Sequence, residues 1–190
     1  MKIATWNLER LIKNKNEAVL AKIKEIDADI FVLTETNSTI SLEDYNSVCT
    51  ETLSKGQDGI AYKERENRES IWTKYPILKS YETYDRFTSV CADIETPLGV
   101  LTVYGTIIGV FANKQPRFDE DLFGQIEDFN RIFPGKQVCI IGDLNIMFSG
   151  FAYLVIRHVS QSMKCVARLK TTNIICKSGP HYFIFFFFTG

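Results

Sequence analysis

Residues 138–145 read VCIIGDLN, and this stretch says more about the fold than any other part of the chain. Its first half is a short apolar run rich in β-branched side chains, which is typical of a buried strand. A turn follows, in which Asp143 and Asn145 stand two positions apart and would share one face of an extended segment. A carboxylate beside a carboxamide can orient a water molecule and hold an anionic oxygen. The same residues also suit a turn that merely ends the strand.

The composition predicts one soluble globular domain. The 190 residues are enough for a sizeable core, and 45% are hydrophobic while 24% are charged. A net charge of -1 argues against binding of duplex nucleic acid through a broad positively charged surface. We expect neither a signal peptide nor a membrane span, because no apolar run is long enough. The five scattered cysteines form no metal or disulfide spacing, which fits the reducing cytoplasm. A monomer is expected.

Apolar periodicity divides the first 150 residues into strands and helices. An amphipathic helix is expected over 16–26, and a second helix over 119–133, where three acidic residues favour its start. A charged hairpin loop is expected over 63–69. Strands are predicted over 3–7, 30–33, 59–62, 70–73, 89–95, 100–104 and 138–141. Helices that alternate with pairs of strands predict an α/β or α+β protein with two packed sheets.

Three of these strands end on polar residues that suit metal or phosphate chemistry. Asn7 ends the first strand, Glu35 follows the second, and Asp143 with Asn145 follows the last. Strand ends that gather at one edge of a sheet are a common place for a site. Carboxylate and amide oxygens suit a hard cation such as Mg²⁺ or Mn²⁺, and the chain has no cluster of Cys and His for zinc.

Five short motifs, in this order, resemble the endonuclease/exonuclease/phosphatase superfamily, which includes abasic-site endonucleases and DNase I. They are TWNLE at 5–9, TET at 34–36, IWTKYPI at 71–77, VYG at 103–105 and IGDLN at 141–145. The resemblance covers residues 1–153. It implies an α/β fold, a four-layer αββα sandwich of the DNase I-like type. It also implies Mg²⁺- or Mn²⁺-dependent hydrolysis of a phosphoester substrate, with nucleic acid among the candidates.

The resemblance assigns three residues to a metal site. Glu35 matches the glutamate that binds the metal, and Asn7 matches the asparagine that supports the site. Glu9 stands where some members place another acid near the metal, although a surface role for Glu9 is equally open.

The resemblance also assigns catalytic residues. Asp143 matches the aspartate that orients the attacking water, and Asn145 the amide that binds the phosphate. Tyr104 is a candidate phosphate contact, with a place in the core as the equal alternative. The family's last motif, an Asp-His pair, leaves only His181 as a candidate by chain position. Pro180 precedes this histidine, so the carboxylate that would fix its tautomer is missing.

Residues 154–190 form a tail of different character. All 23 acidic residues precede Leu154, and the tail carries five basic residues and ends in a phenylalanine-rich run. We therefore expect an incomplete superfamily domain over 1–153, with its C-terminal strands missing or replaced, and an atypical basic, Phe-rich segment over 154–190. A frameshift is one hypothesis for this change. Resequencing the locus tests it, because a clean open frame with no in-register alternative would rule it out.

Two classes of function remain open. The first is a metal-dependent phosphodiesterase or endonuclease-type hydrolase. The missing Asp-His pair argues against full activity in this class. The second is a catalytically inactive truncated or frameshifted remnant, or a non-catalytic binding protein. Loops select the substrate in such folds, and none here distinguishes DNA, RNA, a lipid head group or a sugar phosphate.

Overall fold

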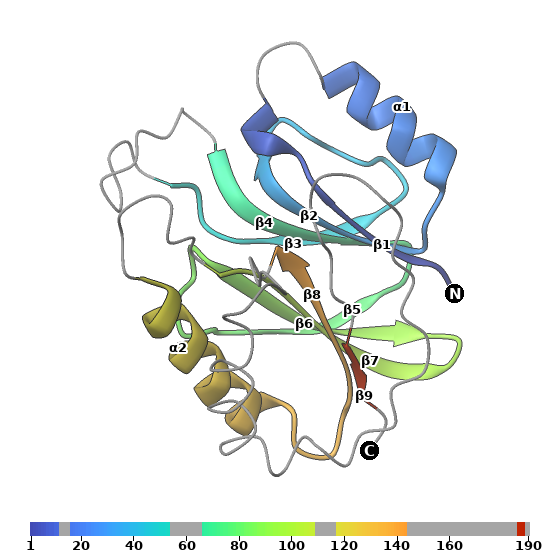
Figure 1. Ribbon diagram of the computed structural model, residues 1–190. Coiled ribbons are helices and arrows are strands. Elements are labelled where there is room, and N and C mark those ends of the chain that lie inside the picture. The colour runs from blue at the N-terminus through green and yellow to red at the C-terminus, as the bar shows by residue number, and fades with distance from the viewer. Residues whose placement is uncertain (12–15, 54–65, 109–116, 144–185, 189–190) are drawn as a thin grey trace, which may run out of the picture.

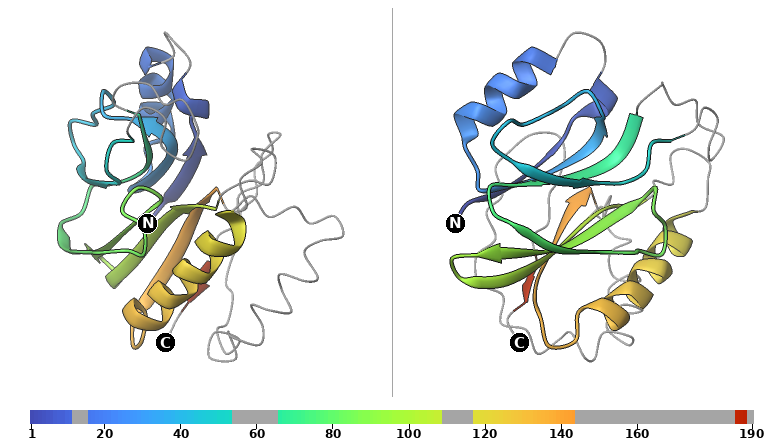
Figure 2. Two further views of the ribbon diagram at one scale, coloured as in Figure 1. Left: turned by 90° about the vertical axis from the view of Figure 1, so that its left-hand side faces the viewer. Right: turned by 180° about the vertical axis from the view of Figure 1, so that it is seen from behind.

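The computed structural model describes residues 1–11, 16–53, 66–108, 117–143 and 186–188, and these residues form four layers. Figure 1 shows helix α1 (Asn16–Ile26) above one sheet and helix α2 (Arg117–Ile132) against the outer side of a second sheet. The edge-on view on the left of Figure 2 shows the same order of helix, sheet, sheet and helix. The predicted four-layer αββα sandwich is therefore confirmed.

The first sheet, sheet A, has four strands in the order β1-β2-β4-β3. β1 runs parallel to β2, whereas β4 is antiparallel to both β2 and β3. A short 3-10 helix, η1 (Glu9–Leu11), follows β1. The strands are β1 (Ile3–Asn7), β2 (Ile30–Asn37), β3 (Asn46–Cys49) and β4 (Glu66–Thr73).

The second sheet, sheet B, has five strands in the order β5-β6-β7-β8-β9. β7 and β8 are parallel, and the other neighbouring pairs are antiparallel. Because β8 follows α2, the β7-α2-β8 segment is a crossover with its helix on the outer face of the sheet. The strands are β5 (Ile77–Tyr81), β6 (Ser89–Thr96), β7 (Gly99–Ile107), β8 (Gln137–Asp143) and β9 (Phe186–Phe188).

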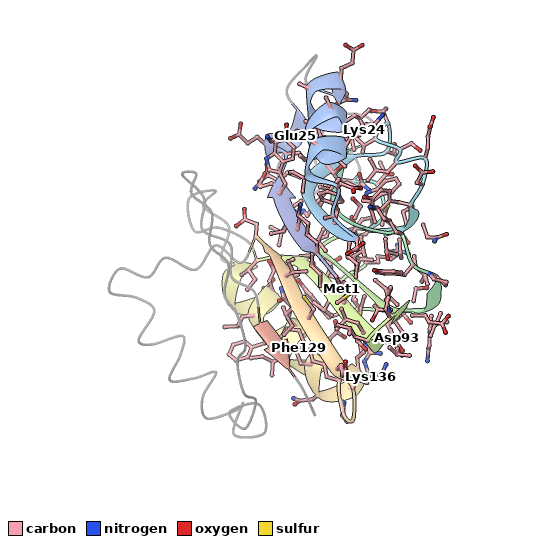
Figure 3. All side chains as sticks on the ribbon, turned by 90° about the vertical axis from the view of Figure 1, so that its right-hand side faces the viewer. Met1, Lys24, Glu25, Asp93, Phe129 and Lys136 are labelled. Atoms are coloured by element: carbon pink, nitrogen blue, oxygen red, sulfur yellow. The ribbon has the colours of Figure 1, made fainter. Side chains whose placement is uncertain are left out.

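Three apolar clusters fill the spaces between the layers. Phe31 and Leu33 of β2 pack with α1, while Ile30 and Val32 of the same strand pack toward sheet B. This alternation follows from the two-residue period of a strand whose faces are both covered. The third cluster lies between sheet B and α2 and includes Phe129, which Figure 3 labels beside sheet B, far from Lys24 and Glu25 on α1.

Most of the predicted elements are confirmed. Helix α1 and strand β1 have the predicted bounds, and α2, β2, β6, β7 and β8 differ from their predictions only at their ends. Strands β3 and β5 were not predicted, because each is short and largely exposed and so lacks a clear apolar pattern. The predicted hairpin loop over 63–69 is wrong from Glu66 onward, since β4 begins there and pairs with β2. The predicted strand over 59–62 lies outside the described residues.

Most of the atypical tail also lies outside the described residues. Its one described element, β9, pairs with β8 through Phe186–Phe188 and so extends sheet B beyond that strand. Among the described helices, none has the length and apolar character needed to cross a membrane.

Candidate active site

Asn7 lies between two carboxylates from different parts of the chain. Its amide nitrogen Nδ2 donates to Oδ2 of Asp143 at 2.8 Å and to Oε1 of Glu35 at 3.2 Å. Its amide oxygen Oδ1 accepts a hydrogen bond from the backbone N–H of Glu9 at 2.8 Å. Both ends of the buried amide are therefore used, which fixes its orientation. We call Asn7, Glu35 and Asp143 the carboxylate cluster.

The cluster joins the two sheets at the ends of their strands. Asn7 ends β1 and Glu35 lies near the end of β2, both in sheet A, whereas Asp143 ends β8 of sheet B. The side chains of Val32 and Ile141 fill the space between the sheets earlier along these strands. The layer between the sheets thus changes from apolar to polar where the strands end. The ends of β1, β2 and β8 meet, but across two sheets and not at one edge of a single sheet as predicted.

Glu35 reaches the cluster through an unusual backbone conformation. Strict alternation along β2 would turn its side chain toward α1, as for Phe31 and Leu33. Instead, Glu35 has φ 48° and interrupts the pairing of β2 with β4, which continues on either side of it. A left-handed conformation is costly for any residue other than glycine and is often retained at functional positions. Here it turns the carboxylate toward Asn7.

The environment of Glu35 favours its neutral form. Partial burial is the main reason that the pKa of this carboxyl is raised, and the negative charges of Asp143 and Glu9 raise it further. The hydrogen bond from Asn7 and the positive charge of Arg10 oppose these effects. A cation bound beside Glu35 would favour the charged form of this carboxyl against these effects.

Gly142 allows β8 to place Asp143 in the carboxylate cluster. A Cβ atom at this position would lie 2.0 Å from the backbone oxygen of Thr106 on β7, and its φ of 146° is rare for any residue with a side chain. Beyond it, the backbone oxygen of Asp143 accepts a hydrogen bond from the N–H of Ile108 at 3.0 Å. The glycine of the GDLN motif thus has a steric role that the sequence alone did not specify.

Glu69 is a further acidic residue that the sequence analysis did not select. It lies on β4, is fully buried, and neither of its carboxylate oxygens meets hydrogen-bond geometry with another group of the described residues. Burial raises its pKa well above the ordinary value, with a smaller contribution from Asp143 and an opposing one from the backbone of Thr106. Its Oε1 occupies the space that a Cβ of Gly105 would need, at 2.8 Å. The one signal in the sequence was an acid directly before the strand predicted over 70–73.

Tyr104 does not join the carboxylate cluster. It is fully buried on the α2 side of sheet B, where its ring contacts Phe129 and Phe133. Its hydroxyl donates to Oδ2 of Asp128 at 2.8 Å and lies 3.1 Å from Oγ of Ser89. Of the two roles that the sequence left open for Tyr104, phosphate contact or core residue, its position matches the core residue.

The remaining predicted site residues lie at the rim or beyond the described chain. Glu9 is exposed, and its charge acts on Glu35. Asn145 and His181 both lie outside the described residues.

The cluster fits a divalent cation with few protein ligands. In the part of the chain that the structure describes, no three His, Cys, Asp or Glu side chains gather as a complete metal cage. Mg²⁺ commonly binds through only one or two carboxylates, together with waters and substrate phosphates. Glu35 and Asp143, converging on the amide of Asn7, supply that smaller set.

A scan against protein-family models gives no match, and neither does a comparison with curated proteins. Solved structures do match. An endonuclease/exonuclease/phosphatase family protein from Leptotrichia buccalis has a TM-score of 0.61 at 16% identity, over 85% of this chain and 74% of that one. The endonuclease domain of TRAS1, a telomere-specific retrotransposon, gives 0.62 at 11% identity, over 85% and 70%.

A third solved structure, the 3′ phosphatase NExo from Neisseria bound to a product DNA hairpin, gives a TM-score of 0.56 at 14% identity, over 77% of this chain and 58% of that one. At these identities the comparisons establish the fold. The resemblance of the chain to the endonuclease/exonuclease/phosphatase superfamily is therefore confirmed at the level of the fold.

Proposed function

We propose that this protein is a divalent-metal-dependent phosphoester hydrolase, of the nuclease or phosphatase kind. The observation that carries the proposal is the position of Asn7, whose amide donates to Glu35 from sheet A and to Asp143 from sheet B. Two of the similar structures are described as an endonuclease domain and a 3′ phosphatase, which supports this class of reaction.

Glu35 would hold the cation, Mg²⁺ or Mn²⁺, with Asn7 orienting its carboxylate and Glu9 adding negative charge at the rim. A bound divalent cation neutralises charge on a phosphate and stabilises the leaving oxygen. A cation beside Glu35 would favour the charged form of this carboxyl against its partial burial, which raises its pKa.

Asp143 would orient the attacking water and accept its proton. The Asn7 amide at 2.8 Å fixes one carboxylate oxygen, Oδ2, so that Asp143 keeps a constant direction relative to Glu35. Asn145, two residues further on, remains the predicted phosphate-binding amide, and His181 remains a predicted catalytic residue. The three free cysteines of the described chain accord with a cytoplasmic location.

A non-catalytic product is the second candidate, favoured by one observation in the sequence. No acidic residue follows position 153, so His181 has no nearby carboxylate from its own segment to fix its tautomer. In that case the fold would still present Glu35 and would bind a cation without cleaving a substrate.

One experiment separates the two candidates. Nicked, abasic and single-stranded DNA and bis-(p-nitrophenyl) phosphate are assayed with Mg²⁺ and with EDTA, while calorimetry measures Mg²⁺ binding. A hydrolase shows Mg²⁺-dependent turnover that Asp143→Ala abolishes. Mg²⁺ binding that depends on Glu35 without any turnover supports the non-catalytic protein, and turnover that survives EDTA contradicts the metal assignment.

A further inference from the structure

Arg10 forms an ion pair that has one buried end and one end at the surface. Its Nη2 lies 2.8 Å from Oε2 of Glu66, the first residue of β4. The side chain of Glu66 is 6% exposed, whereas that of Arg10 is 37% exposed. The buried Glu66 carboxylate thus holds the Arg10 guanidinium, while part of the Arg10 side chain faces solvent.

The backbone around Arg10 is set by the same turn that orients Asn7. Glu9 and Arg10 have φ values of 50° and 59°, which two consecutive residues with side chains rarely adopt. Two hydrogen bonds hold this turn: the N–H of Leu8 donates to the Thr34 oxygen, and the N–H of Glu9 donates to Oδ1 of Asn7. Unfavourable backbone conformations of this kind persist where the surroundings enforce them, often at functional positions.

The ion pair places Arg10 at the strand ends that carry the carboxylate cluster. Glu66 pairs with Asn37, two residues after Glu35 on β2. Arg10 also follows Asn7 by only three residues, and the N–H of Glu9 between them donates to Oδ1 of Asn7. The ion pair thus presents a guanidinium at the same strand ends as Asn7 and Glu35.

We propose that Arg10, held in place by Glu66, binds a non-bridging oxygen of the substrate's phosphate group at the carboxylate cluster. The proposal rests on the function proposed above and adds a residue that determines phosphate affinity. A planar guanidinium donates hydrogen bonds in a fixed fork that matches phosphate oxygens. Glu66 makes that fork rigid, so less side-chain entropy is lost when the phosphate binds.

The variants are chosen to keep the fold intact. Replacing Arg10 alone would leave the buried Glu66 carboxylate without its cation, and such changes are strongly destabilising. The double variant Arg10→Gln/Glu66→Gln removes both charges and keeps hydrogen-bonding groups at both positions, and Arg10→Lys keeps the charge without the fork. Lys74→Ala is the matched control, because Lys74 pairs with Asp27 at the opposite end of β2. Thermal melting confirms that each variant is folded.

Calorimetric titration with inorganic phosphate in the presence of Mg²⁺ measures the affinity directly. We expect the double variant to bind phosphate about tenfold more weakly or worse, Arg10→Lys to fall between it and the wild type, and Lys74→Ala to match the wild type. Unchanged affinity in the folded double variant would overturn the inference, as would a wild type that binds no phosphate.

Turnover of bis-(p-nitrophenyl) phosphate is measured in parallel, so that the two proposals can fail separately. Turnover with an unaltered phosphate affinity in the double variant overturns the role of Arg10 and leaves the hydrolase standing. Phosphate binding that depends on Arg10 without any turnover supports the anion-binding role and overturns the hydrolase.

Discussion

Asn7 Nδ2 lies 2.8 Å from Asp143 Oδ2, although the two residues are 136 positions apart in the chain. The contact joins the last residue of β1 in sheet A to the last residue of β8 in sheet B. A second hydrogen bond from the same nitrogen reaches Glu35. One amide therefore sets the relative positions of both carboxylates, and the geometry of the site depends on how the two sheets pack.

Asn7→Ala should disable the site while preserving the fold. Without the amide, Glu35 and Asp143 lose their shared donor and repel each other, so we expect turnover to fall about 100-fold or more. The loss of hydrogen bonds to charged groups should lower the free energy of unfolding by about 1–3 kcal/mol. Steady-state kinetics and urea denaturation measure the two effects. Asn46→Ala is the control, because the Asn46 amide donates to the Tyr75 oxygen at an exposed position of β3. Equal turnover in both variants would contradict the role of Asn7.

The Glu69→Gln variant should gain stability relative to the wild type as the pH rises. Burial raises the folded-state pKa of Glu69 well above its ordinary value of 4.5, so the native protein binds this proton more tightly than the unfolded chain does. The wild type therefore loses stability as the pH rises from the unfolded pKa through the folded pKa, whereas the glutamine does not titrate. Denaturation from about pH 4 to about pH 8 measures the difference. Glu17→Gln, on the exposed face of α1, is the control. A difference that stays constant with pH would show that Glu69 does not titrate within this range.

Gly142→Ala should destabilise the protein more than Gly99→Ala does. Both glycines have positive φ, but a Cβ on Gly142 would meet the Thr106 oxygen at 2.0 Å, whereas one on Gly99 would meet nothing within 4 Å. The comparison separates steric overlap from backbone strain. We expect an additional loss of about 1–3 kcal/mol for Gly142→Ala, measured by chemical denaturation. Equal losses would mean that β7 can move away from β8 at little cost.

Tyr104→Phe should reduce stability and leave turnover unchanged. The variant keeps the ring between Phe129 and Phe133 but leaves the buried Asp128 without the hydrogen bond from the Tyr104 hydroxyl. A loss of about 1–3 kcal/mol is expected for a hydrogen bond to a charged acceptor. Thermal melting and kinetics on the same samples test both parts. A fall in turnover with no loss of stability would instead support a phosphate contact.

Much of the architecture and the centre of the site could be predicted from local sequence. The apolar runs before Asn7, Glu35 and Asp143 predict strands that end on these residues, and the period of residues 16–26 predicts α1. These features depend on side-chain spacing within one element, which is a local property of the chain. The motifs shared with the superfamily supplied the roles that spacing could not.

Packing between distant segments decided the rest. The pairing of β4 with β2 and β3 placed Glu69 in the space left by Gly105, and no local pattern predicts so buried an acid. The face of β7 that α2 covers placed Tyr104 in the core. The sequence by itself thus determined which residues stand at the strand ends. Only the tertiary structure decided which of them meet, because the contact of sheet A with sheet B joins residues that are far apart in the chain.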